Sequence, residues 1–253
     1  MLFCAKLREL SGGKPVGIKL CVGKHRELFC ILKAMRATGV HLDFITVDGS
    51  EGGTGAAPLE LTNSVGTPLV EGLLFVHNAL VGVGLRDEVK LLASGKVTTG
   101  FDVARLLAIG ADACYAARAM MFALGCIQAR RCNSNDCPAG VATQNPGLER
   151  GLVVKDKARR GGPEPRAPGK AVSGRVGAAG RDAPPPRRPR HHPRRVGPTQ
   201  VKRYDEIYEY LETGALLGDQ VPERYARAWH AAHPERFERD PTQRPTPMVM
   251  LAG

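Results

Sequence analysis

The sequence predicts an α/β fold built around a parallel β-sheet, and three observations support this prediction. Short apolar runs alternate with helical patterns through the first 150 residues of the 253-residue chain. These runs are nearly continuous in apolar residues, which is typical of parallel strands covered on both faces. Hydrophobic residues make up 43% of the chain, but aromatic residues only 5%, and there are 30 glycines, so we expect an aliphatic core punctuated by glycine.

Four strand–loop–helix units follow one another in this region. The expected strands lie at about residues 15–20, 44–48, 89–97 and 111–117. The expected helices lie at about residues 25–38, 68–82, 99–111 and 119–129. Four such units make either a small doubly wound sheet or half of an eight-stranded barrel.

Residues 161–195 interrupt this pattern. They contain eight prolines and six glycines but few aliphatic side chains larger than alanine, so we expect the segment to be disordered. Order is expected to return in a helix with Thr199 as its N-cap and Gly214 near its end. The apolar stripe of that helix would consist of Val201, Tyr204, Tyr208 and Leu211. The turn-rich tail, with prolines at 241, 245 and 247, is expected to be irregular.

The net charge of +11 is concentrated in the same interrupting segment. Residues 161–195 supply +7 of it, and the +4 carried by the rest of the chain is ordinary. The arginines of residues 187–195 are not interleaved with aromatic side chains that could stack on bases, which argues against a nucleic-acid binder. No signal peptide is visible, and the longest apolar region, near residues 70–85, is too short to span a bilayer. We therefore expect a cytoplasmic protein with neither nucleic-acid nor membrane partners.

Two loops that follow expected strands have features of binding sites. After the third strand, which ends at Ser94 and Gly95, a helix opens at Gly100, and the N-terminus of a helix attracts anions. The loop at residues 48–58, after the second strand, contains four glycines, which leave its backbone accessible. The alternatives are an ordinary turn in the first case and a long flexible connection in the second.

Lys19 stands inside the apolar strand PVGIKL. A charged ammonium group in such a setting needs a partner or a cavity. At the C-terminal end of a barrel strand, a residue of this kind indicates catalysis or cofactor binding. The alternative is a lysine that reaches out to solvent at the edge of the sheet.

Three of the seven cysteines, Cys126, Cys132 and Cys137, lie within twelve residues. A zinc site needs a fourth ligand, and His77 and Cys114 could approach only through the fold. Three thiolates suit an iron–sulfur cluster with one open corner, and clustered cysteines in a reducing compartment bind metal or do redox chemistry more often than they form disulfides. The spacing alone also allows buried unreactive thiols, zinc or a disulfide.

Four motifs occur together and in order: IKL, ITVDGSEGGTGAAP, ASGKVTTGFDVARLLAIGAD and ARAMMFALGCIQARRCNSNDCPAGVATQNP. Together they closely resemble the FMN-binding domain of glutamate synthases, most of all the stand-alone subgroup. The similarity covers about residues 5–160, and a weaker similarity resumes at about residues 194–217.

The resemblance implies a (β/α)8 barrel that holds FMN at its C-terminal face and a 3Fe–4S cluster. The cluster would be bound by Cys126, Cys132 and Cys137. Lys19 would face the flavin and the substrate, as the catalytic residue. The flavin and its phosphate would be held by Lys19, Gly52, Gly53, Ser94, Gly95, Gly100, Ala117 and Arg118.

The implied reaction is the reductive amination of 2-oxoglutarate to glutamate. Ammonia from glutamine would condense with 2-oxoglutarate, and reduced FMN would deliver a hydride to the 2-iminoglutarate. No nicotinamide fingerprint occurs in the sequence, so we expect a separate electron-donor subunit or a ferredoxin as the electron source.

A complete barrel needs eight βα units, and only four precede residue 150. We therefore expect residues 1–160 to form the C-terminal half of the barrel with its iron–sulfur loop. Residues 161–195 would be a disordered segment that a reading-frame error could produce, and residues 196–253 a helical segment with an irregular tail. The alternative to an active enzyme is a truncated, non-catalytic remnant that retains at most cluster binding.

Overall fold

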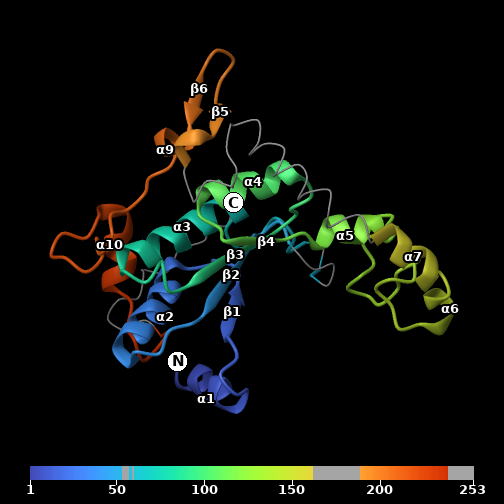
Figure 1. Ribbon diagram of the computed structural model, residues 1–253, viewed down its shortest axis with the longest axis horizontal. Helices are drawn as coiled ribbons and strands as arrows, with labels where there is room; N and C mark the ends of the chain where they lie inside the picture. The colour runs from blue at the N-terminus through green and yellow to red at the C-terminus, as the bar shows by residue number, and fades with distance from the viewer. Residues whose placement is uncertain (53–56, 59, 162–188, 239–253) are drawn as a thin grey trace, which may run out of the picture.

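A four-stranded parallel sheet forms the centre of the computed structural model, which describes residues 1–52, 57–58, 60–161 and 189–238 (Figure 1). The strand order is β1-β2-β3-β4, and every neighbouring pair is parallel. The strands are β1 (Gly17–Leu20), β2 (Phe44–Asp48), β3 (Lys90–Ser94) and β4 (Ala113–Tyr115). Because they follow in chain order and alternate with helices, the prediction of an α/β fold of partial-barrel type is confirmed.

Three helices connect successive strands and pack on one face of the sheet (Figure 1). They are α2 (His25–Thr38), α3 (Leu69–Gly82) and α4 (Gly100–Ile109). The core lies between these helices and the sheet, where the largest fully buried side chains include Leu32, Met35, Ile45, Leu73, Leu80, Leu91 and Leu106. α3 is apolar almost all round because other segments cover its outer side as well. No helix in the described ranges is long and apolar enough to cross a membrane.

An additional helix, α1 (Leu2–Leu10), precedes the first strand and was not predicted. It is tied to the sheet by Arg8, whose Nη2 donates to the Asp43 carboxylate at 2.7 Å and to the His41 carbonyl at 2.6 Å. Asp43 also accepts a hydrogen bond from the backbone N–H of Val16 at 2.6 Å. Although burial works in the opposite direction, these hydrogen bonds and the charge of Arg8 lower the pKa of Asp43. No residue of α1 is buried, and its apolar residues Phe3, Leu7 and Leu10, which recur at helical spacing, are exposed.

The helix predicted over residues 199–214 is wrong in most of its length. The chain instead forms a hairpin, β5 (Pro193–Arg195) with β6 (Val201–Arg203), preceded by the 3-10 turn η1 (Pro189–His191) and followed by the single turn α9 (Tyr204–Ile207). The backbone then extends at Tyr208. Side-chain hydrogen bonds from α3 replace helical ones here, since the amide of Asn78 donates to the Glu209 carbonyl at 2.8 Å and accepts from the Leu211 N–H at 3.1 Å.

The last described helix, α10 (Glu223–His230), packs across α2 and α3 and was also not predicted (Figure 1). Trp229 meets Phe29 edge-on, with ring centroids 5.3 Å apart. Lys33 of α2 donates to the carbonyls of Trp229 and Ala232 at 2.8 and 3.1 Å. Tyr225 stacks on Phe75 of α3. The prediction of disorder over residues 161–195 is wrong for residues 189–195, which form η1 and β5. Residues 162–188 of that segment and the irregular tail expected after residue 238 lie outside the described residues.

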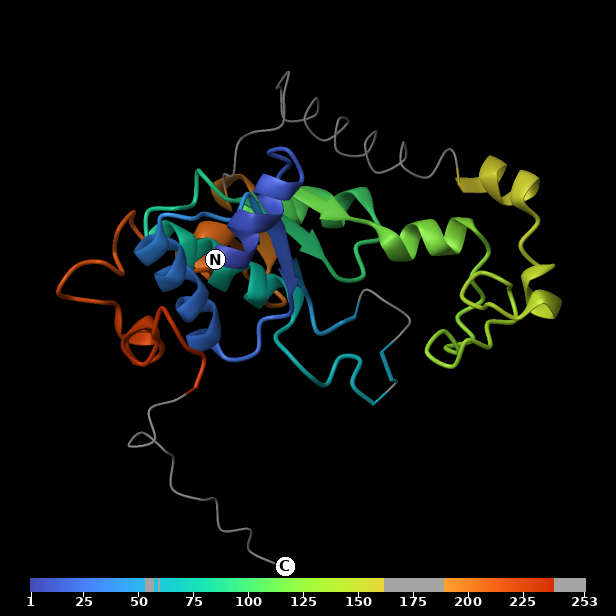
Figure 2. The same ribbon diagram turned by 90° about the horizontal axis from the view of Figure 1, so that it is seen from below.

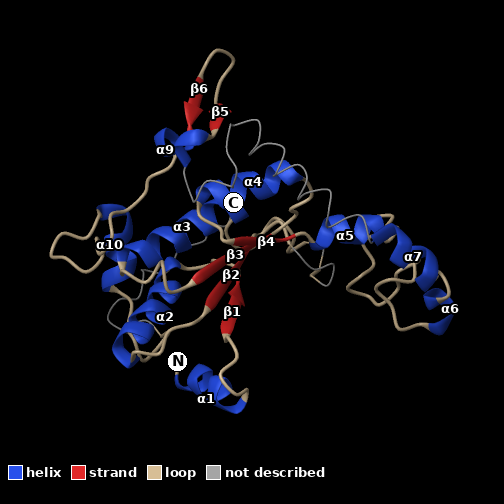
Figure 3. Ribbon diagram, viewed as in Figure 1, coloured by secondary structure: helices blue, strands red, loops and turns tan. Residues whose placement is uncertain are grey.

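The helix predicted at residues 119–129 is shorter than expected. It spans α5 (Ala117–Ala123), and the chain turns at Gly125, which has a φ of +94°. With α6 (Pro146–Glu149) and α7 (Val154–Gly161), it forms an arm that extends away from the sheet (Figure 2). Between α5 and α6 the arm is mostly loop (Figure 3), and this loop carries the three clustered cysteines.

The start of α4 makes a reciprocal cap, which leads to a first prediction. The Asp102 N–H donates to Thr99 Oγ1 at 3.1 Å, and Asp102 Oδ2 accepts from the Thr99 N–H at 3.0 Å. Replacing Thr99 with alanine is expected to lower the free energy of unfolding by about 1 kcal/mol. Urea denaturation at neutral pH measures the change, and a loss below about 0.3 kcal/mol would contradict it.

The same cap predicts a dependence on pH. Burial opposes ionisation of Asp102, but hydrogen bonds from Thr99 and from the Thr98 N–H outweigh it and lower the pKa of Asp102 below its ordinary 3.8. The stabilisation is therefore complete above pH 3.8 and is lost as the pH falls through the lowered pKa. The difference between the wild type and Thr99→Ala should shrink over that acid range, and a difference that stayed constant down to pH 2 would speak against this assignment.

Candidate functional site

The C-terminal ends of β1 and β2 bring Lys19 and Asp48 together. Lys19 Nζ lies 2.8 Å from Asp48 Oδ2, with the lysine side chain 48% exposed and the aspartate 17% exposed. The second carboxylate oxygen, Oδ1, is buried and has no hydrogen-bond partner among the described residues. Both side chains line a hollow of about 440 Å³, here called the strand-end hollow, which also borders Gly52. Lys19 thus has both a partner and a cavity, as a charged group inside an apolar strand requires.

The loops after β2 and β3 are joined backbone to backbone. The Gly49 N–H donates to the Ser94 carbonyl at 2.8 Å. Gly95 has a φ of +144°, and a Cβ there would lie 3.2 Å from the Gly49 nitrogen, so a side chain would strain the contact. The carboxylate of Glu51 accepts from the Leu69 N–H at 3.0 and 3.1 Å, where α3 begins. These contacts fix the start of the glycine loop, whereas Gly53 lies outside the described residues.

A second hollow of about 530 Å³ lies between the glycine loop, the turn after β3 and the cysteine loop, and is here called the loop hollow. It shares Gly52, Ala57 and Thr62 with the strand-end hollow. Its cationic lining residues are Lys96, Arg118 and Arg130, and two of the clustered cysteines, Cys126 and Cys132, line it as well. A concave surface with three cations suits an anionic ligand such as a phosphate.

Only one of the residues predicted to hold the phosphate lines a hollow. Arg118 lines the loop hollow, but Ser94, Gly95, Gly100 and Ala117 line neither this hollow nor the strand-end hollow. Ser94 is buried at the end of β3. Gly100 is the first residue of α4 and directly follows the capping residue Thr99. The structure therefore joins Lys19, Gly52, Arg118 and two cysteines around two adjoining hollows.

The cysteine loop has an unusual backbone. Gln128, Arg130 and Asn135 all have positive φ angles, of 57°, 54° and 60°. Non-glycine residues in this region persist where the surroundings hold them, and they cluster at ligand sites. Asn135 is held by its side-chain oxygen, which accepts from the Gln144 N–H at 2.8 Å.

The pKa values of Cys137 and Cys114 are shifted in opposite directions. Burial alone would raise the pKa of Cys137, but hydrogen bonding to the backbone at residues 139–142 outweighs burial and lowers this pKa below its ordinary 9.0. By contrast, burial, aided by the charge of Asp102, raises the pKa of Cys114 to about 12. A thiolate is the form that binds metal, so Cys137 is prepared for that role and Cys114 is not.

The described residues contain no group of three or more His, Cys, Asp and Glu placed to hold a metal ion. Cys126 and Cys132 line the loop hollow, and Cys137 lies outside its lining. His77 is engaged elsewhere, because Arg86 Nε donates to its Nδ1 at 3.1 Å. All three clustered cysteines are free and half-buried. Thiols are the donors that iron–sulfur clusters use, but the described residues do not gather these three into one metal-binding group.

Three side chains of this region were not predicted as site residues from the sequence. Asp48 ends a strand immediately before the glycine loop, and that position marks residues at the C-terminal edge of a parallel sheet. Lys96 follows Gly95 in the corresponding place after β3 and donates to Asn63 Oδ1 at 2.9 Å. Arg130 lies between two of the clustered cysteines in the sequence and lines the loop hollow. Position at a strand end was a usable signal for the first two.

Comparison with known proteins gives matches over the same part of the chain. A family model described as "Conserved region in glutamate synthase" matches residues 2–160. The glutamate synthase large subunit-like protein YerD of Bacillus subtilis is 49% identical over 158 residues, which are 62% of this chain and 30% of that protein. The archaeal glutamate synthase (NADPH) of Methanocaldococcus jannaschii is 42% identical over 118 residues, 47% of this chain and 23% of that protein. Ferredoxin-dependent glutamate synthase 2 of Synechocystis is 43% identical over 142 residues, 56% of this chain and 9% of that protein. The chain spans less than a third of the length of each of these relatives.

Proposed function

Because this chain belongs to the glutamate synthase family, we propose that it contributes an FMN site and a 3Fe–4S site to the reductive amination of 2-oxoglutarate. The observation that carries the proposal is the pair of adjoining hollows at the C-terminal end of the sheet. In barrel enzymes this end of the strands is where active sites lie. The lysine–aspartate pair borders one hollow and the cationic lining borders the other, so one elongated anionic cofactor would meet both.

The residues present fit a flavin phosphate at one end and a reactive centre at the other. Arg118, Lys96 and Arg130 would hold the phosphate, and Gly52 would allow close approach of the ring system. When bound, FMN supplies hydride transfer. The Asp48 carboxylate lies 2.8 Å from Lys19 Nζ and holds that side chain at the edge of the strand-end hollow. The ammonium of Lys19 would orient the carboxylate of 2-oxoglutarate or an electron-rich edge of the cofactor. Ser94, Gly95, Gly100 and Ala117 would support the site by shaping the two turns rather than by direct contact.

Cys126, Cys132 and Cys137 would hold the cluster. An iron–sulfur cluster supplies one-electron transfer when bound. The backbone hydrogen bonding that lowers the pKa of Cys137 favours the thiolate that ligation requires. We propose ammonia, from glutamine or free, as the second substrate, and a separate subunit or a ferredoxin as the electron donor. The names of two relatives, one an NADPH and one a ferredoxin enzyme, support a donor outside this segment.

A second candidate function is a cluster-binding remnant without catalysis. It is favoured by the sheet itself, in which β1 and β4 are edge strands whose outer sides pair with no other strand of the described residues. A closed eight-stranded barrel has no such edges.

Anaerobic reconstitution of the chain with FMN, iron and sulfide tests the proposed function. We expect bound flavin and cluster spectra, and reoxidation of the reduced flavin that depends on 2-oxoglutarate together with either glutamine or free ammonia. A cluster spectrum without bound flavin would support the remnant instead. A colourless protein would contradict both.

Replacing Lys19 with methionine is expected to weaken flavin or substrate binding by about tenfold to a hundredfold. The reason is the loss of one charge-assisted interaction worth about 1.5–3 kcal/mol. Quenching of FMN fluorescence on titration measures flavin binding, and reoxidation at varied 2-oxoglutarate measures substrate binding. Lys14→Met is the matched control. Lys14 is exposed and precedes the N-terminal end of β1, whereas Lys19 lies near the C-terminal end of that strand. Equal behaviour of the two variants in both assays would exclude the role given to Lys19.

A further inference from the structure

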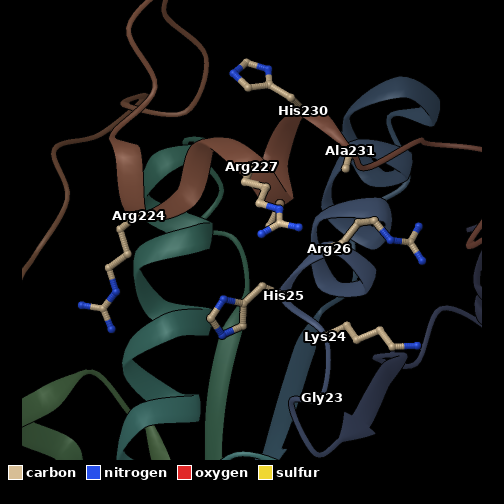
Figure 4. Close-up of a pocket in the computed structure, with 9 residues that line it drawn as sticks. Gly23, Lys24, His25, Arg26, Arg224, Arg227, His230 and Ala231 are labelled. Carbon is tan, nitrogen blue, oxygen red and sulfur yellow. The ribbon is translucent and has the colours of Figure 1, made fainter. Parts of the chain in front are cut away.

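A third hollow, of about 740 Å³, lies between the start of α2 and the helix α10, and is here called the basic hollow (Figure 4). None of its lining residues lines the strand-end hollow or the loop hollow. Its volume falls within the range of sites that hold small molecules, roughly 300–1,000 Å³. No part of the function proposed above uses it.

The lining of this hollow is basic and contains no carboxylate. Its basic members are Lys24, His25, Arg26, Arg224, Arg227 and His230. Lys24 and Arg224 each have a carboxylate at the periphery, Glu27 at 3.5 Å and Glu209 at 3.6 Å. Arg227 forms no ion pair within the described ranges of the chain. Gathering these cations in one concavity costs electrostatic repulsion, which a bound anion would relieve.

The backbone adds to this positive potential. α2 is fourteen residues long, and its N-cap, Lys24, makes no side-chain capping hydrogen bond. The first N–H groups of such a helix and its dipole favour an anion. Figure 4 shows Arg227 on α10 directed toward the gap between α10 and the first turn of α2. The guanidinium of Arg227 and the N-terminus of α2 thus border the same space.

Arg26 provides a second, independent indication of a ligand. The residue is only 8% exposed. Its terminal nitrogens are used, one toward Cys30 Sγ at 3.7 Å and the other toward the Phe237 carbonyl, but its Nε is buried without a partner among the described residues. A buried donor without an acceptor is costly, and a shift of the Arg26 side chain toward the hollow would let an oxyanion supply that acceptor.

We propose that the basic hollow binds a small molecule that carries a pyrophosphate group. Guanidinium groups match phosphate oxygens in pairs. Arginines on two sides of a space of this volume fit two linked phosphates better than a single one. This site is independent of the flavin and cluster sites and does not rest on the proposed reaction.

His25 offers a probe of binding inside the hollow. Its ring stacks on Phe75, with centroids 3.8 Å apart. Burial, and then the charge of Arg224, lower the pKa of His25 below 6.5. A bound anion would offset the charge of Arg224, so the imidazole signal should titrate at higher pH in its presence.

Calorimetric titration of the full chain with inorganic pyrophosphate tests the proposal, with inorganic phosphate and succinate as comparison ligands. We expect saturable pyrophosphate binding that is at least about tenfold tighter than binding of either comparison ligand, together with the shift of the His25 signal. No pyrophosphate binding, or succinate binding of equal strength, would overturn the proposal.

The variant Arg227→Gln should weaken pyrophosphate binding about tenfold, and so should Arg224→Gln. Both side chains are exposed, so the fold is not at risk. Arg150→Gln is the matched control, because Arg150 is exposed and lies outside the hollow. If all three variants lost affinity equally, the binding would be due to overall charge, and the proposed site would be wrong.

Discussion

Replacing Arg86 with alanine is expected to lower the free energy of unfolding by about 3–5 kcal/mol. Arg86 is 5% exposed, and its guanidinium joins several parts of the fold. It donates to His77 at 3.1 Å, to the Val89 carbonyl at 2.9 Å, and to the Gly110 carbonyl and the Asp112 carboxylate at 2.7 and 2.9 Å. The alanine variant would leave the Asp112 carboxylate without its counter-charge and the two carbonyls without this donor. Removing one partner of a buried pair costs more than replacing both partners, because the remaining charge stays buried and uncompensated.

Urea denaturation measures this loss, and Arg159→Ala is the control. Arg159 also pairs with a carboxylate, Asp156, at 3.3 Å, but its side chain is 83% exposed. An exposed pair of this kind contributes at most about 0.5 kcal/mol. If Arg86→Ala cost less than about 1 kcal/mol, the guanidinium would not be a main connection between α3, β3 and β4.

Replacing any one of Cys126, Cys132 or Cys137 with serine is expected to abolish the proposed cluster. A cluster with three protein ligands has none to spare, and serine is a poor substitute for a thiolate. The measurements are the iron content, the visible absorbance and the low-temperature electron paramagnetic resonance signal of the reconstituted chain. We expect each signal to fall to the level of a chain that was not reconstituted.

Cys114→Ser is the matched control for these variants, since Cys114 is half-buried like the three and its pKa is raised to about 12. It should keep the full iron content. If only one of the three substitutions mattered, or if Cys114→Ser had the same effect, the three-cysteine ligand set would be wrong. Far-ultraviolet circular dichroism of every variant separates loss of the cluster from loss of the fold.

The central sheet and its helices could be predicted because local pattern and burial agree there. The expected ranges for β2 and α2 coincide with the observed ones. In β2, Ile45, Thr46 and Val47 are all buried, as expected for a parallel strand covered on both faces. The stop of α2 at Gly39, with a φ of +66°, follows from the tolerance of glycine for that conformation.

The C-terminal segment could not be predicted because its structure depends on what it packs against. The spacing of Tyr204 and Tyr208 is that of a helix, but the Asn78 amide takes the backbone hydrogen bonds of Glu209 and Leu211. α10 has only eight residues and buries only two of them, Tyr225 and Trp229. Two buried positions are too few to identify so short a helix from the sequence.

For the candidate site, the sequence identified Lys19 but not its partner. Pairing of Lys19 with Thr46 in the sheet register places Asp48 two residues further along β2, diagonally opposite. That register is a property of the assembled sheet and is not visible in either segment alone. The hollow between the glycine loop and the cysteine loop likewise arises only once the two segments meet.

The docking of α10 on α2 and α3 has a consequence for how the protein is made. Phe75 stacks on Tyr225, which follows it by 150 residues, and Phe29 meets Trp229 even later in the chain. While the ribosome synthesises the intervening residues, roughly 10–30 s at usual elongation rates, that aromatic face has no cover. The nascent chain therefore presents an apolar surface to chaperones and to other nascent chains until α10 has been made.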